Sequence, residues 1–220
     1  EFSSSVTRCD MQWRLFVFFL GGPNHKAAGI RVCKLRCLCI RIGSGFDATA
    51  QLGPVVSRRH FDRVMGFIDG ARREGATALT GGERARDAGC FIQPTVFVDV
   101  NPGMQVVREE VFGPVLVAMP FDDVEDAIRQ ANDTPFGLTA SVWSNDLSAV
   151  HRIVPRIKAG TVWVNTHNLL DANLPFGGYK QSGFGRDLGR AAVESYTEQK
   201  SVCMAVCRTD TKESITEETT

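Results

Sequence analysis

The sequence contains no uninterrupted apolar run of about 18 residues, the length that a membrane-spanning helix requires. Its most apolar stretch, Trp13 to Leu20, is broken by Arg14, and no small-residue cleavage site follows it as in a secretory signal. The formal net charge is zero, because 25 basic residues balance 25 acidic ones. A nucleic-acid binder that neutralises phosphates would need a basic excess. We therefore expect a cytoplasmic protein with no nucleic-acid and no membrane partner.

The cysteines lack the spacing of a structural framework. Seven are distributed unevenly over 220 residues, with long Cys-free stretches between them. A secreted disulfide framework would have an even number at closer spacing. Cys33, Cys37 and Cys39 lack the paired C-x2-C geometry of a zinc ribbon. The histidines share no common spacing either, so we predict no metal site.

Composition divides the chain into zones. Residues 1–42 are rich in Cys, Arg and Phe and have no sustained period of 2 or 3.6, so we predict an irregular leader there. The middle of the chain alternates apolar runs with amphipathic segments. Residues 208–220 are rich in Thr and Glu with one large apolar residue, and we expect them to be disordered.

The middle zone predicts an α/β domain. Continuous apolar strands that alternate with amphipathic helices are typical of a parallel sheet covered on both faces. Pro155 should kink the helix that contains it. The predicted elements, in chain order, are a helix capped by Ser57 and stopped near Gly75, strand 91–98 with an edge or bulge at Pro94, strand 115–119, a helix capped at Asp122 or Asp123, strand 138–143, helix 146–158 and strand 161–164.

Two polar segments adjoin predicted strands. Residues 165–168 (NTHN) follow strand 161–164, and ligands of open α/β sheets gather at the carboxyl ends of strands. This segment could hold a substrate or a catalytic water, or it could be a capped turn. Residues 109–114 (EEVFGP) precede strand 115–119. Their carboxylates could accept hydrogen bonds from vicinal hydroxyls, or they could be a solvated surface.

A glycine-rich segment, residues 175–186, invites comparison with phosphate-binding loops. It does not match, because no strand leads into it and because Gly183 and Gly185, followed by Gly189, give G-x-G-x-x-x-G rather than the dinucleotide fingerprint. It also lacks the G-K-[ST] ending of a P-loop. We predict instead that these glycines let the chain pass close beneath other loops.

Three of these segments together resemble the NAD(P)-dependent aldehyde dehydrogenase superfamily. The resemblance covers about residues 43–206, in the order and at the spacing of the family. The segments concerned are 109–114 (EEVFGP), 160–165 (GTVWVN) and 175–183 (PFGGYKQSG), with 91–96 (FIQPTV) and 196–198 (YTE) in support.

The resemblance implies hydride transfer from an aldehyde to NAD or NADP through a covalent adduct on a cysteine. Glu110 would hydrogen-bond the hydroxyls of the nicotinamide ribose, and Phe112 would pack near the nicotinamide ring. His60 and Arg63 fall where family members contact the adenosine half. No residue is assigned as the nucleophile.

The resemblance also implies a substrate side and a partner. Asn165 would support the architecture of the active site, and Asn168, Leu170 and Phe176 would line the tunnel for a small-molecule aldehyde. Residues 201–207 would be the oligomerisation strand through which the parent protein forms a dimer or tetramer.

The chain departs from the family before residue 43. The Gly-Gln-x-Cys motif of the nucleophile is not present, and the cofactor-binding domain is expected to be missing. We therefore interpret residues 43–200 as a partial catalytic domain, the carboxyl-terminal part of an aldehyde dehydrogenase that is inactive alone. The leader begins Glu1-Phe2 and could be a cloning or frameshift artefact. The alternative is a non-catalytic truncated homologue that serves oligomerisation or binding, and composition leaves open an interaction role for the tail.

Overall fold

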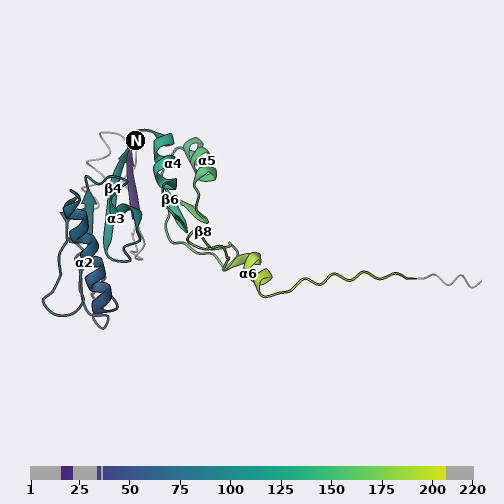
Figure 1. Ribbon diagram of the computed structural model, residues 1–220, viewed down its shortest axis with the longest axis horizontal. Helices are drawn as coiled ribbons and strands as arrows, with labels where there is room; N and C mark the ends of the chain where they lie inside the picture. The colour runs from purple at the N-terminus through teal and green to yellow at the C-terminus, as the bar shows by residue number, and fades with distance from the viewer. Residues whose placement is uncertain (1–15, 22–33, 36, 207–220) are drawn as a thin grey trace, which may run out of the picture.

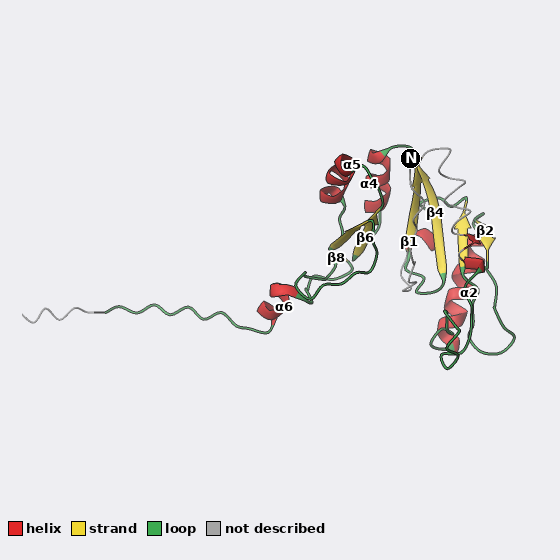
Figure 2. Cartoon of the chain, turned by 180° about the vertical axis from the view of Figure 1, so that it is seen from behind, coloured by secondary structure: helices red, strands yellow, loops and turns green. Residues whose placement is uncertain are grey.

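The computed structural model describes residues 16–21, 34–35 and 37–206 (Figure 1). The tail predicted to be disordered and most of the predicted leader lie outside these residues. The described chain has a first lobe built around a four-stranded sheet and a second lobe of short helices and strands. An extended segment runs away from the second lobe after the last helix (Figure 2).

The four-stranded sheet has the order β1-β4-β3-β2. Strands β1 (Phe16–Gly21), β4 (Val115–Phe121) and β3 (Thr95–Val98) are parallel, whereas β2 (Thr77–Thr80) is antiparallel to β3. Strand β1 lies in the zone for which the sequence predicts no regular element. An apolar run of six residues without alternation is too short for periodicity to identify as a strand.

Helix α2 (Arg58–Arg73) confirms the helix predicted after Ser57. The Ser57 hydroxyl accepts a hydrogen bond from the His60 N–H at 3.2 Å, which satisfies one of the free donors of the first turn. The helix ends at Arg73 with Glu74 as its C-cap, and Gly75 follows with a φ of 101°. Its predicted apolar face is buried in the core, which contains Phe61, Val64, Ile68 and Ala71 of α2 together with Phe97 and Val117 of the sheet.

Helices α3 (Gln105–Arg108) and α4 (Val124–Asn132) flank strand β4 along the chain. The Asp123 carboxylate caps α4 by accepting from the Asp126 N–H at 2.8 Å, so the helix begins at one of the two predicted positions. The predicted helix 146–158 is shorter than expected. Helix α5 (Leu147–Ile153) is followed by the 3₁₀ turn η1 (Val154–Arg156), because Pro155 has no N–H with which to continue an α-helix.

The two later strands do not join the main sheet, which corrects the prediction of one parallel sheet. Strands β6 (Thr139–Val142) and β7 (Thr161–Val164) form a separate parallel pair. Strands β5 (Phe136–Gly137) and β8 (Tyr179–Lys180) form a short antiparallel pair. Helix α6 (Gly189–Ser195) follows. Among the described residues, no helix combines the length and the apolarity needed to cross a membrane.

Close backbone approach explains Gly177 and Gly178 of the segment 175–186, as predicted, whereas a Cβ atom on Gly183 or Gly185 would have no neighbour within 4 Å. A Cβ atom on Gly160 would overlap the carbonyl group of Gly177. A Cβ on Gly177 would overlap the Gly185 carbonyl oxygen, and one on Gly178 would overlap that of Ser182. The loop can therefore pass close to Gly160 and turn back on itself only if these positions carry no side chain.

Two glycine-to-alanine substitutions should therefore have opposite effects. Gly160→Ala would push a methyl group into the Gly177 carbonyl, and overpacking of this kind typically costs about 1–3 kcal/mol. Gly66→Ala adds a methyl group at an exposed position of α2 with no neighbour within 4 Å, and should stabilise by about 0.5–1 kcal/mol. Urea unfolding of both variants measures the difference. Equal effects of the two substitutions would contradict the packing account.

Candidate functional site

The loop of residues 109–114 enters strand β4 in an unusual conformation. Phe112 has a φ of 54°, in the left-handed region that a phenylalanine rarely adopts. Gly113 is buried against α2, and a Cβ atom there would lie 2.6 Å from Cγ1 of Val64. The loop therefore reaches β4 through one strained residue and one residue without a side chain.

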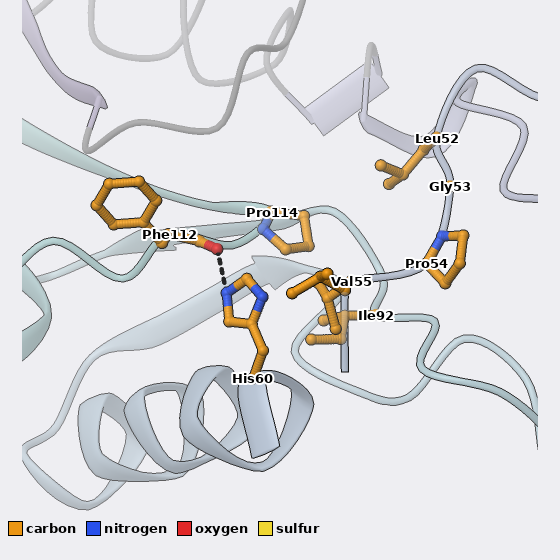
Figure 3. Close-up of a pocket in the computed structure, with 9 residues that line it drawn as sticks. Leu52, Gly53, Pro54, Val55, His60, Ile92, Phe112 and Pro114 are labelled. Carbon is orange, nitrogen blue, oxygen red and sulfur yellow. Dashed lines mark hydrogen bonds between the residues drawn. The ribbon is translucent and has the colours of Figure 1, made fainter. Parts of the chain in front are cut away.

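Side chains of helix α2 donate hydrogen bonds to consecutive carbonyl groups of this loop. Arg63 donates from Nη2 to the carbonyl oxygen of Glu110 at 2.8 Å and from Nη1 to that of Val111 at 2.7 Å. Nε2 of His60 lies 2.6 Å from the Phe112 carbonyl oxygen (Figure 3). Because a carbonyl oxygen can only accept, Nε2 of His60 is the donor. The carbonyl groups of residues 110–112 are thus all bound by one helix.

The spacing of the donors explains how one helix can reach the whole loop. His60, Arg63 and Val64 are three and four residues apart, so they lie on the same face of α2. The Arg63 guanidinium also lies over the ring of Phe67, with its carbon 4.8 Å from the ring centroid. Phe67 is buried, so the ring holds the guanidinium in one place.

A cavity of about 220 Å³ lies beside these contacts. Its walls are mostly apolar, with His60 as the polar exception, and the Phe112 side chain at its edge is 50% exposed. Figure 3 shows His60 reaching from α2 toward the Phe112 carbonyl, with Val55 and Ile92 nearby. The lining residues are Leu52, Gly53, Pro54, Val55, Val56, His60, Ile92, Phe112 and Pro114.

The structure brings together the four residues that the resemblance implies for cofactor binding. The Glu110 side chain is half-buried, and its carboxylate makes no hydrogen bond or ion pair with another described residue. His60 and Arg63 lie against the backbone of the loop that contains Glu110 and Phe112. The sequence gives no sign of these side-chain-to-carbonyl contacts, because residues 60 and 110 are distant along the chain.

Asn165 lies at the carboxyl end of β7 and hydrogen-bonds Ser144, which lies just after the neighbouring strand β6. Its Oδ1 accepts from the Ser144 N–H at 2.9 Å, and its Nδ2 donates to the Ser144 carbonyl oxygen at 2.9 Å. Both hydrogen bonds connect the segments that follow β6 and β7. This contact favours the capped-turn interpretation for the Asn165 side chain, which is consistent with a supporting position.

His167 packs beneath the same segment, where the sequence indicates only a polar residue. Its Nδ1 lies 2.9 Å from the Ser141 hydroxyl oxygen, and its ring meets the Trp163 ring edge-on at 5.2 Å between centroids. The Trp163 indole N–H donates to the Leu169 carbonyl oxygen at 2.8 Å. Partial burial lowers the pKa of His167 below its usual value of 6.5.

The residues expected to line a substrate tunnel lie in this second lobe. Asn168 is half-buried with a φ of 57°, and the Leu170 side chain is 53% exposed. Phe176 is half-buried, and its backbone exchanges two hydrogen bonds of 2.7 Å with Asp187. None of the three lines the cavity beside His60. Within the described part of the chain, no group of three or more His, Cys, Asp or Glu side chains could hold a metal ion.

A family model described as the aldehyde dehydrogenase family matches residues 31–202. The chain belongs to the aldehyde dehydrogenase family. The match begins before residue 43, where the resemblance in the sequence begins. It therefore includes residues 31–42 of the predicted leader, and the cloning or frameshift origin of residues 1–42 stays a hypothesis.

Individual relatives agree with this assignment. The chain is 47% identical over 202 residues to a betaine aldehyde dehydrogenase of Cereibacter sphaeroides, and the match covers 92% of this chain and 41% of that protein. Its fold is similar to that of an aldehyde dehydrogenase from Bacillus cereus solved as an NAD+ complex. There the TM-score is 0.82 at 43% identity, covering 84% of this chain and 38% of the other.

A betaine aldehyde dehydrogenase from Staphylococcus aureus, solved in complex with NAD+, is also similar. Its TM-score is 0.78 at 38% identity, covering 82% of this chain and 36% of the other. The chain therefore spans about two fifths of the length of each of these relatives.

The depressed pKa of His167 predicts a pH dependence of stability. Because burial favours the neutral ring, the unfolded chain binds a proton more readily, and the folded state loses stability as the pH falls below about 6.5. His167→Gln should make the urea midpoint less sensitive to pH between 7.5 and 5. His151→Gln, which removes an exposed histidine of α5, serves as the control. The same pH sensitivity in the His167 variant and the wild type would contradict the account.

Proposed function

We propose that this chain forms the carboxyl-terminal part of an NAD(P)-dependent aldehyde dehydrogenase, which oxidises an aldehyde to a carboxylic acid. The observation that supports this best is the loop 109–114, in which Glu110 and Phe112 are held beside α2 in a member of the family. The NAD+ complexes of the Bacillus cereus and Staphylococcus aureus enzymes support a nicotinamide dinucleotide as the cofactor.

The residues present fit the nicotinamide half of such a cofactor. A carboxylate has two acceptor oxygens, which match the two vicinal hydroxyls of a ribose, and the Glu110 carboxylate has no described partner that would compete. The half-exposed Phe112 ring offers an apolar surface at the edge of the cavity. When bound, the nicotinamide ring would accept the hydride of the aldehyde.

The chain's own contribution would then be orientation. Glu110 would fix the ribose, and Phe112 would limit where the nicotinamide ring can lie. The ring would then already have the orientation that hydride transfer requires. Asn165 would hold the segments after β6 and β7 together through Ser144. Asn168, Leu170 and Phe176 would face an aliphatic or arylalkyl aldehyde. The covalent step of the family is not assigned to any residue of this chain.

The alternative function is a non-catalytic homologue that serves oligomerisation or binding. Residues 201–206 are extended and exposed, with Val202 75%, Met204 77% and Val206 79% accessible. An uncharged, β-prone and extended segment favours pairing with another chain. Self-association through this segment is expected for both functions, so it does not distinguish them. A Glu110 carboxylate that has no partner among the described residues favours the enzyme, since a purely structural module has no use for it.

Glu110→Gln in the full-length enzyme tests whether this carboxylate belongs to the cofactor site. Hydrogen bonds to a charged group contribute about 1.5–3 kcal/mol, so the loss of the carboxylate should lower turnover roughly tenfold or more. Steady-state kinetics with NAD+ and an aliphatic aldehyde measures the effect. The control is Glu109→Gln, because the neighbouring carboxylate is exposed and bonded to Gln105 of α3. Equal kinetics for both variants would remove Glu110 from the site.

A further inference from the structure

We propose that His60 and Arg63 are positioning residues, which act on the loop 109–114 rather than on the adenosine half of the cofactor. They fix the backbone at residues 110–112, and this in turn sets the directions of the Glu110 carboxylate and the Phe112 ring. The consequence for the cofactor rests on the proposed function, whereas the contacts themselves do not.

The direction of the donors supports this role. Nη1 and Nη2 of Arg63 each donate to a loop carbonyl, and Nε2 of His60 donates to the next one. The planar fork of a guanidinium suits two neighbouring acceptors, whereas a lysine ammonium would offer a single point charge. The Phe67 ring beneath Arg63 holds the guanidinium in this orientation. Side chains oriented in this way are engaged with the protein before any ligand arrives.

The conformation of the loop explains why it needs these donors. Phe112 occupies the left-handed region at a φ of 54°, and a phenylalanine would leave that region without support. The Phe112 carbonyl is the acceptor of the His60 hydrogen bond, at 2.6 Å. Gly113, the next residue, packs against Val64 of the same helix. Helix and loop therefore form one rigid unit around the strained residue.

Positioning and ligand binding differ in what the free protein shows. If His60 and Arg63 position the loop, their removal loosens residues 110–113 in the absence of any cofactor. If they bind the nucleotide directly, the free loop is unaffected and only cofactor binding weakens. His60→Gln adds a second distinction, because a glutamine amide can donate to the Phe112 carbonyl as the imidazole does.

The test is backbone ¹⁵N relaxation of the 220-residue chain without ligand. We expect order parameters near 0.85 for residues 110–113 in the wild type and below about 0.6 in Arg63→Gln and His60→Ala. His60→Gln should retain the wild-type order. Arg58→Gln is the matched control, because Arg58 lies on α2 but pairs with Asp62 and not with the loop. Unchanged order in both Arg63→Gln and His60→Ala would overturn the proposal.

Loss of order in α2 and β3 along with the loop would also overturn it, because the proposed effect is local. If Arg63→Gln does not fold, the comparison of His60→Ala with His60→Gln decides the question alone. Titration of the full-length enzyme with NAD+ then separates this proposal from the proposed function. Amide shifts at Glu110 and Phe112 that appear in the wild type and fail in Arg63→Gln support both proposals.

Loop order that depends on Arg63, with no NAD+-induced shift in the wild type, would contradict the cofactor assignment and leave the positioning role standing. The same NAD+-induced shifts in the wild type and in Arg63→Gln would overturn the positioning role and leave the cofactor assignment standing.

Discussion

The contact between helix α2 and the backbone carbonyls of residues 110–112 is the interaction on which the candidate site depends. A loop that carries a phenylalanine at positive φ has few ways to hold its shape, and strain of this kind persists only where the surroundings impose it. Here Arg63 supplies two hydrogen bonds and His60 a third, and Val64 packs against Gly113. The core beneath α2 holds the helix in place, and the helix in turn holds the loop in its conformation.

The sequence predicts this helix and this loop separately, but not the contact between them. Ser57, Gly75 and the apolar residues at helical spacing mark α2 locally, and the EEVFGP segment marks the loop by family resemblance. The hydrogen bonds of Arg63 join residues more than forty positions apart, and no periodicity reports such a pairing. The sequence did not predict strand β1 for a related reason. Its short apolar run is recognisable as a strand only from its pairing with β4.

The second lobe obeys a different constraint, which is close packing of backbone on backbone. Gly160, Gly177 and Gly178 leave no space for side chains, and for Gly177 and Gly178 this was predictable from the density of glycines without a phosphate-loop pattern. The separation of β6 and β7 from the main sheet was not predictable. Their apolar runs resemble those of any buried strand, and only tertiary contacts decide which sheet a strand joins. The effect of Pro155 was predictable, because a proline interrupts an α-helix wherever it stands, and α5 ends just before it.

The central claim is that the loop held by α2 presents Glu110 and Phe112 to the nicotinamide half of a dinucleotide. The most direct measurement is an isotope-filtered nuclear Overhauser experiment on the full-length enzyme with saturating NAD+. The account predicts cross-peaks between the Phe112 ring protons and protons of the nicotinamide or its ribose. Cross-peaks from Phe112 to the adenine ring alone, or none to the cofactor at saturation, would contradict it.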